Sequence, residues 1–433
     1  MKSAVIMPHP PIARPLVGRG EEEKIRATLD AYRKASEQIA QDAPETIVII
    51  SPHNIFFRDA FYISPGEIYT DNLARFGASE DWLSIPYDTE LREEIIRLCA
   101  EKRIPTVSDK RYAGEPDHGS LIPLLFVSEV YTNFRVVRIA PSFLSDEMLT
   151  EMGRVIERAA AHLGRRITLI ASGDLSHKLL AEGPYGFVKE GPEFDSRITE
   201  MMKNGDLKAF RDFTPEFRDR CAECGLPGFI MLAGALENYH VRPDFLSYEG
   251  TFGVGYAICT FALEDACVRL AKDSLEKYIR SGKRLSRPDE LPEWMTAQQA
   301  GVFVSLHKNG DLRGCIGTIL PWYGCVADEI IALAVEAGTR DPRFYPVKAD
   351  ELEHLEYNVD VLSEAEPAEF DQLDAKRYGV IVTNGNRRGL LLPDLEGVET
   401  PEQQISISLR KAGIRPDEPY KIERFTVERH AQE

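Results

Sequence analysis

The sequence predicts an α/β protein: a mostly parallel open sheet with flanking helices, followed by a smaller α+β domain. Short, nearly continuous apolar runs alternate with amphipathic stretches over the first two-thirds of the chain, which is typical of parallel strands covered on both faces. Near residue 265 this alternation stops, and an Asn-Gly hairpin signal follows. The length of 433 residues leaves room for two domains, which we expect at 1–267 and 268–433.

The strands of the first domain are predicted from apolar, β-branched runs: Ser3–Met7, Thr46–Ser51, Phe134–Ile139 and Ile167–Ser172. Helices are expected between them, over Glu21–Gln41, Thr89–Lys102 and Ser145–Leu163. The segment from Pro243 to Leu263 reads as two further strands joined around Gly250, which predicts an antiparallel edge of the sheet.

The second domain is predicted to follow a helix over Asp265–Arg280 and a polar loop over Ser281–Glu293. Strands at Gly301–Leu306 and Leu312–Leu320 flank an Asn-Gly pair, which suits a tight turn that needs positive φ. A helix at Cys325–Glu336 and strands at Tyr357–Leu362 and Gly379–Val382 complete the expected α+β domain.

The composition indicates a globular protein and excludes several partners. Apolar residues make up 43% and charged residues 28% of the chain, and the formal net charge of −18 disfavours nucleic acid and anionic membranes. No apolar run reaches the roughly 18 residues of a membrane span, and the apolar start is too short for a signal peptide. Seven cysteines do not suggest a disulfide framework. We expect a cytoplasmic protein that acts on a small molecule, and a homo-oligomer stays open.

The placement of the histidines is the most informative feature of the sequence. His9, His53 and His177 each follow a predicted strand directly, at the strand ends where open α/β sheets bind ligands. One such residue would most simply be a surface or capping histidine, but three at matching positions predict a site. His118, on an expected loop before an apolar stretch, is a fourth candidate.

Two imidazoles and one carboxylate would hold Fe(II) on one face and leave positions open for substrate and oxygen. Zinc or another divalent metal is the alternative. Glu249 is the candidate carboxylate, because it interrupts an apolar strand pair and an unpaired buried acid is costly. A solvent-facing glutamate in a hairpin is the competing interpretation of this position.

These residues resemble a known family. The first 265 or so residues are similar to the LigB-like class III extradiol ring-cleavage dioxygenases, through Pro8-His9-Pro10, Pro52-His53, Asp117-His118-Gly119, Leu175-Ser176-His177 and Glu249. The resemblance implies that His9, His53 and Glu249 ligate non-haem Fe(II). It also implies that His177 is the catalytic acid–base and that His118 binds substrate or supports the ligands.

The resemblance further implies a catechol-like or other vicinal-diol substrate, for which an imidazole titrating near neutrality is a suitable base. Asp174 departs from the ring-cleaving pattern, because many relatives carry a small neutral residue at this position. A carboxylate close to His177 would favour the imidazolium form and weaken the base. Two alternatives therefore stay open: a metal-dependent non-oxidative enzyme (hydrolase, lyase or transferase), and a non-catalytic module that binds a partner through the second domain.

The second domain resembles another family, the AMMECR-type domain called AmmeMemoRadiSam system protein A. The matching motifs are Leu312-Arg313-Gly314-Cys315-Ile316-Gly317-Thr318, Asp341-Pro342-Arg343-Phe344 and the stretch from Gly389 to Asp394. The combination implies Memo-like or radical-SAM proteins as partners. Cys315 could act as a nucleophile if Arg313 and Arg343 lie nearby, but a small buried strand residue is the commoner role.

The remaining cysteines and histidines carry weaker signals. Cys221 and Cys224 have the spacing of a redox motif, yet a lone pair is weak support for zinc, and a structural role is expected. His240, His307, His354 and His430 lie in polar or terminal contexts, and we expect them to be structural.

Overall fold

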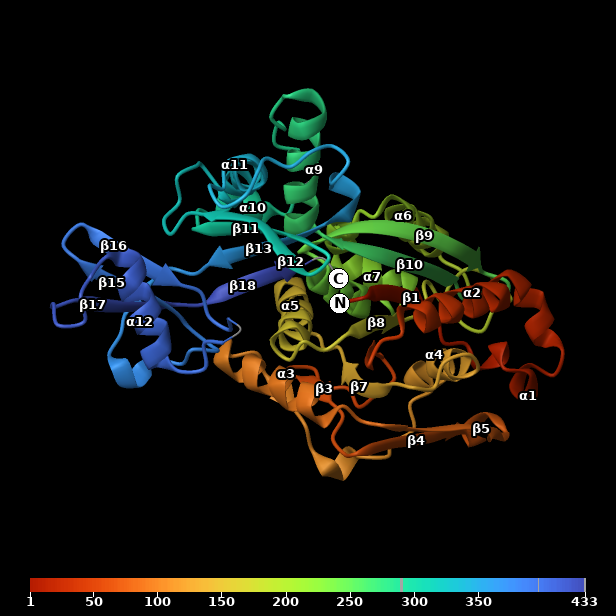
Figure 1. The fold of residues 1–433 in the computed structure, drawn as a ribbon. Helices are drawn as coiled ribbons and strands as arrows, with labels where there is room; N and C mark the ends of the chain where they lie inside the picture. The colour runs from red at the N-terminus through yellow and green to blue at the C-terminus, as the bar shows by residue number, and fades with distance from the viewer. Residues whose placement is uncertain (289–290, 396, 432–433) are drawn as a thin grey trace. The chain divides into compact units, whose positions relative to one another are not determined.

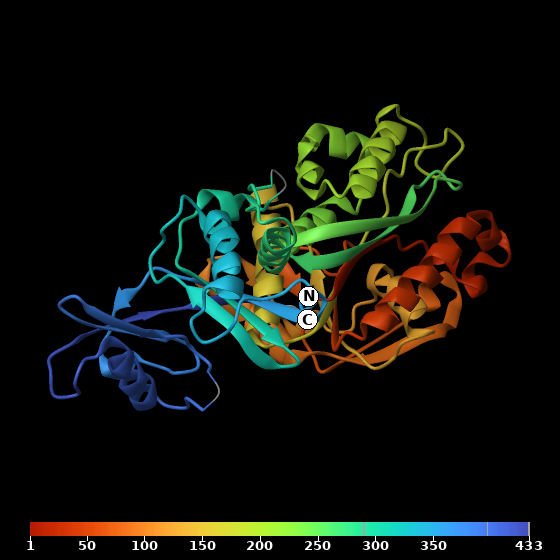
Figure 2. The ribbon, with the colours of Figure 1, turned by 45° about the horizontal axis from the view of Figure 1, so that its top comes forward.

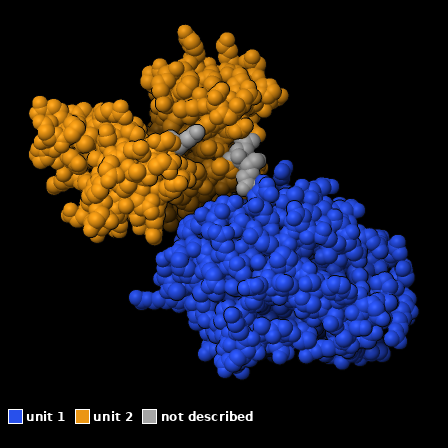
Figure 3. Space-filling view, turned by 60° about the horizontal axis from the view of Figure 1, so that its bottom comes forward, with its two compact units in different colours: residues 1–237, 241–263 blue, residues 238–240, 264–433 orange. Residues whose placement is uncertain are grey.

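The computed structural model describes residues 1–288, 291–395 and 397–431. These residues form two compact units, one of residues 1–237 and 241–263 and the other of 238–240 and 264–433 (Figure 3). Asp289 and Glu290, part of the predicted polar loop, lie outside the described residues.

An eight-stranded mixed sheet forms the framework of the first unit (Figure 1). Its strand order is β6-β3-β7-β2-β8-β1-β10-β9, and the central strands β7, β2, β8 and β1 run parallel to one another. Strand β1 pairs antiparallel with β10, and β3 pairs antiparallel with β7. The predicted α/β class with a mostly parallel sheet is therefore confirmed. The strands are β1 (Ser3–Met7), β2 (Thr46–Ile50), β3 (Phe61–Ile63), β6 (Thr106–Val107), β7 (Arg135–Ala140), β8 (Ile167–Ser172), β9 (Tyr239–Glu249) and β10 (Tyr256–Asp265).

Every residue of β1, β2 and β8 is buried, because helices cover both faces of this sheet. Helix α2 packs on α4, and α5 packs on both α3 and α8 (Figure 2). The helices are α1 (Pro15–Gly18), α2 (Arg26–Asp42), α3 (Thr89–Glu101), α4 (His118–Ser128), α5 (Asp146–His162), α6 (Glu190–Asn204), α7 (Pro215–Cys221) and α8 (Leu226–Ala235).

Three local features differ from the sequence expectation. The helix expected over Glu21–Gln41 is divided into a 3-10 helix at Glu21–Ile25 and α2, because the backbone leaves helical geometry at Ile25. A separate two-stranded ribbon of β4 (Ile68–Leu73) and β5 (Ala78–Pro86) was not predicted. His118 begins helix α4 rather than lying on a loop, because the Asp117 side chain caps that helix.

The second unit contains two four-stranded sheets, with strand orders β12-β11-β13-β18 and β14-β17-β15-β16. Helix α11 packs on α9 and on β11 and β12, and α12 packs on β15 and β16 (Figure 1). The strands are β11 (Val302–Lys308), β12 (Asp311–Gly317), β13 (Leu355–Leu362), β14 (Glu366–Pro367), β15 (Gly379–Asn384), β16 (Arg387–Leu391), β17 (Lys421–Phe425) and β18 (Val427–Ala431). The helices are α9 (Ala266–Ser281), α10 (Glu293–Ala297), α11 (Val326–Thr339) and α12 (Pro401–Ala412).

The predicted Asn-Gly turn joins β11 and β12. Asn309 and Gly310 have φ angles of 54° and 84°, the positive values that a tight turn between antiparallel strands requires. A search of the described residues finds no helix long and apolar enough to cross a membrane.

Candidate metal centre

Three adjacent parallel strands deliver histidines to one edge of the large sheet. His9 lies two residues beyond the end of β1, His53 three beyond β2, and His177 five beyond β8. Because β2, β8 and β1 are neighbours in the sheet, their carboxyl ends share an edge. His118 joins this edge from the first position of α4.

His9, His53 and His118 form a compact group whose ligating nitrogens lie within 4.8 Å of one another. The ring centroids of His9 and His53 are 4.6 Å apart, and those of His53 and His118 are 4.1 Å apart. His9 is buried, His118 is half-buried, and His53 is exposed. In the part of the chain that the structure describes, the ring nitrogens of His53 and His118 make no hydrogen bond, so both rings have nitrogens free for a ligand.

A hydrogen-bond chain fixes the tautomer of His9. Ser172 Oγ donates its single hydrogen to the carbonyl oxygen of Gly119 at 2.5 Å, and it lies 2.9 Å from His9 Nδ1. The serine must therefore accept from His9, which places the imidazole proton on Nδ1. His9 Nε2 is left unprotonated, which is the form that binds a metal, and the Nδ1 contact holds the ring in one orientation.

A buried ion pair supports the beginning of helix α4, where His118 lies. Asp117 Oδ2 accepts from Arg138 at 2.8 Å and from Ser120 Oγ at 2.6 Å, and Asp117 Oδ1 accepts from Ser51 Oγ at 2.7 Å. The Arg138 guanidinium also lies 3.9 Å from the ring centroid of Tyr69. Although burial raises the pKa of Asp117, Arg138 and the hydroxyl donors outweigh it and lower the pKa to about 2. The carboxylate thus stays ionised and links the segments that carry His53 and His118.

Glycine is required at position 119 by this close packing. A Cβ atom there would lie 2.4 Å from Ser51 Oγ and 3.3 Å from His53 Cδ2. The absence of a side chain therefore allows the first turn of α4 to approach the His53 loop.

Burial and mutual repulsion keep the three imidazoles neutral. Burial lowers the pKa of His9 well below its ordinary value, and the neighbouring His53 lowers it further. Burial also lowers the pKa of His53, and burial together with His9 and His53 lowers the pKa of His118 to about 3. Neutral imidazoles are the ligating form, so protons compete little with a metal at neutral pH.

His177 lies beside this group and is half-buried. Its Nδ1 lies 3.1 Å from the carbonyl oxygen of Leu175, so Nδ1 carries the proton and Nε2 is free to accept one. Its ring packs edge-on against Tyr185 at 5.3 Å between centroids. Strand β8, which His177 follows, lies between β1 and β2 in the sheet, so His177 emerges at the same sheet edge as His9 and His53.

Glu249 does not belong to the group that the structure brings together. Its Oε2 accepts from the backbone nitrogen of Thr28 at 2.7 Å and from Thr28 Oγ1 at 2.6 Å. The carboxylate therefore satisfies the first turn of α2, where backbone N–H groups lack helical partners. We expected a metal ligand because this acid interrupts an apolar strand pair, and the contact with Thr28 gives the carboxylate another partner.

Two residues that sequence reasoning set aside or read differently lie against His9 instead. Cys224 Sγ is 3.6 Å from His9 Nε2, and Asp174 Oδ2 is 3.8 Å from the same nitrogen. Asp174 Oδ1 also accepts from the backbone nitrogen of His9 at 2.8 Å, and burial raises the pKa of Asp174 to about 6. Cys221, by contrast, is buried and contacts the Arg218 carbonyl oxygen. The spacing of the two cysteines gave no signal that would have distinguished them.

The residues predicted for the second domain are only partly brought together. Arg343 Nη2 donates to the carbonyl oxygen of Cys315 at 3.2 Å and pairs with Asp341, which also accepts from the Cys315 nitrogen. Arg313 instead pairs with Glu351 at 3.0 Å. Cys315 is half-buried rather than a fully buried strand residue.

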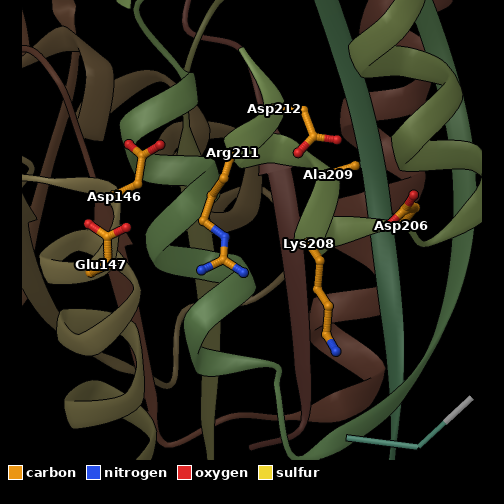
Figure 4. Close-up of a pocket in the computed structure, with 7 residues that line it drawn as sticks. All are labelled: Asp146, Glu147, Asp206, Lys208, Ala209, Arg211 and Asp212. Atoms are coloured by element: carbon orange, nitrogen blue, oxygen red, sulfur yellow. The ribbon is translucent and has the colours of Figure 1, made fainter. Parts of the chain in front are cut away.

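A polar depression of about 510 Å³ lies elsewhere on the first unit (Figure 4). None of the predicted site residues lines it. Its lining residues are Asp146, Glu147, Asp206, Lys208, Ala209, Arg211 and Asp212.

Two family models match this chain, one over each of its domains. The family model described as the catalytic LigB subunit of aromatic ring-opening dioxygenase matches residues 3–259, more than half of the sequence. The chain belongs to the LigB family. A second model, AMMECR1, matches residues 268–430, which confirms the predicted fusion of a LigB domain with an AMMECR-type domain.

The relatives of this LigB protein match shares of the chain that range from about two-fifths to nearly all of it. Protein CA_C1420 of Clostridium acetobutylicum is 39% identical over 460 residues, covering 99% of this chain and 98% of its own. A protein of Thermotoga maritima is 49% identical over 170 residues, 39% of this chain and 98% of its own. The crystal structure of uncharacterized protein PH0010 from Pyrococcus horikoshii is 34% identical and covers 39% of this chain and 90% of that chain, with a TM-score of 0.37.

Proposed function

We propose that the LigB domain is a metal-dependent enzyme of the extradiol dioxygenase type that acts on a catechol-like or other vicinal-diol substrate. The convergence of His9, His53 and His118, with ligating nitrogens within 4.8 Å of one another, carries this proposal. Non-haem Fe(II) is the metal we assign, and zinc or another divalent metal is the alternative. Glu249 is replaced in this ligand set by His118.

The residues present fit a divalent cation. His9 offers an unprotonated Nε2 that the Ser172 contact orients, and the other two rings are neutral and free of hydrogen bonds within the described residues. Asp174 and Cys224 lie against the same His9 nitrogen and would supply an anionic donor. Neutral imidazoles together with one anionic donor, from either Asp174 or Cys224, form a donor set that binds divalent metals.

The proposed reaction divides between the metal and this chain's own side chains. When bound, the metal acts as a Lewis acid that acidifies the diol hydroxyls and supplies the redox chemistry of ring opening. His177 accepts a hydroxyl proton at Nε2, while the Leu175 carbonyl holds its Nδ1–H. Asp174, coupled electrostatically to His177, stabilises the imidazolium once it forms.

A non-oxidative metal enzyme is the second candidate, and Cys224 favours it. Burial raises the pKa of the Cys224 thiol beside His9, so it would become a ligand only by losing its proton to solvent as a metal binds. The resulting nitrogen–sulfur ligand set is one that zinc prefers, and zinc polarises water or a carbonyl group without oxygen. This proposal keeps the same metal centre and changes the reaction from oxygenation to hydrolysis, elimination or transfer.

Two measurements on the full chain test these proposals. Metal analysis of protein purified without chelators should find a divalent metal that the His9→Ala variant loses. Oxygen uptake with a panel of catechols should then follow iron loading. An iron-loaded protein that consumes no oxygen with any catechol would refute the first candidate, and metal-dependent turnover under strict anoxia would establish the second.

Substitution of His177 separates chemistry from metal binding. The His177→Ala variant should keep its metal, because His177 does not belong to the group of three ligands, and should lose turnover by about 10²-fold or more. His162→Ala is the matched control, because His162 is a surface residue paired with Glu94. Equal loss of activity in both variants would contradict the assigned role.

A further inference from the structure

The second unit contains a buried group of three different ligating side chains. One ligand atom each from Asp265, Cys267 and His430 lies within 4.8 Å of the other two. Cys267 is fully buried, and His430 is 5% exposed. Asp265 and Cys267 stand at the beginning of α9, whereas His430 lies on β18, so the group joins segments from opposite ends of this unit.

The hydrogen bonds of this group leave one imidazole nitrogen without a partner. His430 Nδ1 lies 2.8 Å from Asp265 Oδ2, while Asp265 Oδ1 accepts from the backbone nitrogens of Cys267 and Val268. His430 Nε2 is buried and makes no hydrogen bond among the described residues. Buried polar atoms without a hydrogen bond are rare in folded proteins, so this nitrogen needs an explanation.

The surroundings of His430 are acidic. Besides Asp265, Glu428 Oε1 lies 3.9 Å from His430 Nε2. The nearby arginines are engaged elsewhere, since Arg269 pairs with Glu264 and Asp273, and Arg429 pairs with Asp360. Two carboxylates and a thiol thus face one imidazole, and this environment favours positive charge. Although burial lowers the pKa of His430, Cys267 and Asp265 outweigh it and raise that pKa well above its ordinary value, so a bound cation would replace the proton of the imidazolium.

We propose that Asp265, Cys267 and His430 form a second metal site, selective for zinc or a similar borderline-soft divalent ion. Thiolate, imidazole and carboxylate are the three ligand types that zinc accepts in proteins. Tetrahedral zinc places its ligands about 3.3–3.8 Å apart, so atoms that lie within 4.8 Å of one another need to approach by about 1.5 Å at most. Glu428 or water would take the fourth position. On binding, the Cys267 thiol and the His430 imidazolium each lose one proton to solvent, so His430 ligates as the neutral ring and Cys267 as the thiolate.

Such a site would be structural. The stacked ring of Trp294, 6.0 Å from His430 between centroids, covers the imidazole, and the cysteine has no exposed surface. A metal here would tie the beginning of α9 to the last strand of the β12-β11-β13-β18 sheet. This site is independent of the catalytic proposal for the LigB domain, because none of its residues belongs to that centre.

The test uses the full chain with the first metal centre removed by His9→Ala and His53→Ala. In this background, metal analysis after zinc loading and gel filtration should find about one zinc per chain, and Cys267→Ser should abolish it. Cobalt(II) loading should produce thiolate-to-cobalt absorption that the same substitution removes. Cys325→Ser is the matched control, because Cys325 is also buried in this unit but lies outside the group.

Two outcomes would overturn the proposal: no zinc above background in the His9/His53 variant, or equal zinc in the Cys267→Ser variant. If Cys267→Ser fails to fold by circular dichroism, Asp265→Asn decides, because asparagine still caps α9. That variant should bind zinc about tenfold more weakly or worse, and unchanged affinity would overturn the assignment.

Discussion

Replacement of Ser172 by alanine tests the orientation of His9 most directly. The Ser172 hydroxyl accepts from His9 Nδ1 and donates to the Gly119 carbonyl oxygen, and all three residues are buried. Alanine leaves both of those polar groups without this partner, and each buried unsatisfied group costs about 1–3 kcal/mol. We therefore expect the free energy of unfolding to fall by about 2–4 kcal/mol, with some relief if water enters.

The effect on the metal should be separate and measurable. Without the Ser172 contact, the His9 ring is free to rotate and to protonate at Nε2, and loss of such a supporting contact typically weakens metal affinity about 10–100-fold. Urea unfolding monitored by circular dichroism measures the first effect, and competition with a chromophoric chelator measures the second.

Ser36→Ala is the matched control. The Ser36 hydroxyl is also buried, but it has no hydrogen-bond partner among the described residues, so its removal should be neutral or slightly stabilising. If Ser172→Ala binds metal within twofold of the parent chain, the tautomer argument is wrong, whatever happens to stability.

Three further predictions follow from the same unit. Glu249→Gln should leave the metal content unchanged by elemental analysis. It should lower the free energy of unfolding by about 1 kcal/mol, because the carboxylate accepts hydrogen bonds from Thr28 at the beginning of α2. Loss of the metal in this variant would restore Glu249 as a ligand. Burial raises the pKa of Asp117, but Arg138 lowers it, and the net pKa is about 2, below the ordinary 3.8. The ionised carboxylate therefore adds about 2 kcal/mol to the free energy of unfolding above pH 4, and this contribution is lost as the pH falls toward 2. In the Asp117→Asn variant, the free energy of unfolding measured by urea titration should depend less on pH between pH 5 and 2.5. A pH dependence equal to that of the parent chain would contradict this assignment. Gly119→Ala should reduce metal affinity at least tenfold, because the added Cβ would lie too close to Ser51 Oγ. Gly164→Ala is the surface control: its φ is positive and it has no close neighbour, so it should lower the free energy of unfolding by only about 1 kcal/mol.

Much of the framework could be predicted because buried parallel strands leave a strong pattern. Ser3–Met7 and Ile167–Ser172 coincide with β1 and β8, since continuous burial selects apolar and β-branched residues along each strand. The placement of His9, His53 and His177 beyond such strands followed from topology alone. The β4–β5 ribbon was missed because its alternation is interrupted by exposed apolar residues such as Ile68 and Trp82.

The donors around His9 could not be predicted, because they arrive through tertiary contacts. Cys224 lies in the short connection between α7 and α8, and no local pattern indicates that its sulfur meets a residue more than two hundred positions away. The contact between Glu249 and Thr28 escaped prediction for the same reason, because an acid in an apolar run can satisfy a helix terminus as well as a metal. Sequence identifies candidate ligands well, whereas only packing selects among them.

The strand order of the large sheet constrains how this protein is made. Strand β1 precedes both of its sheet neighbours in the chain, because it is inserted between β8 and β10, which are complete only after residues 167–172 and 256–265 have been translated. The β1 side chains, all buried in the folded unit, lack their neighbouring strands until then. Vectorial synthesis therefore delays completion of the sheet on both sides of β1 until β10 has been translated.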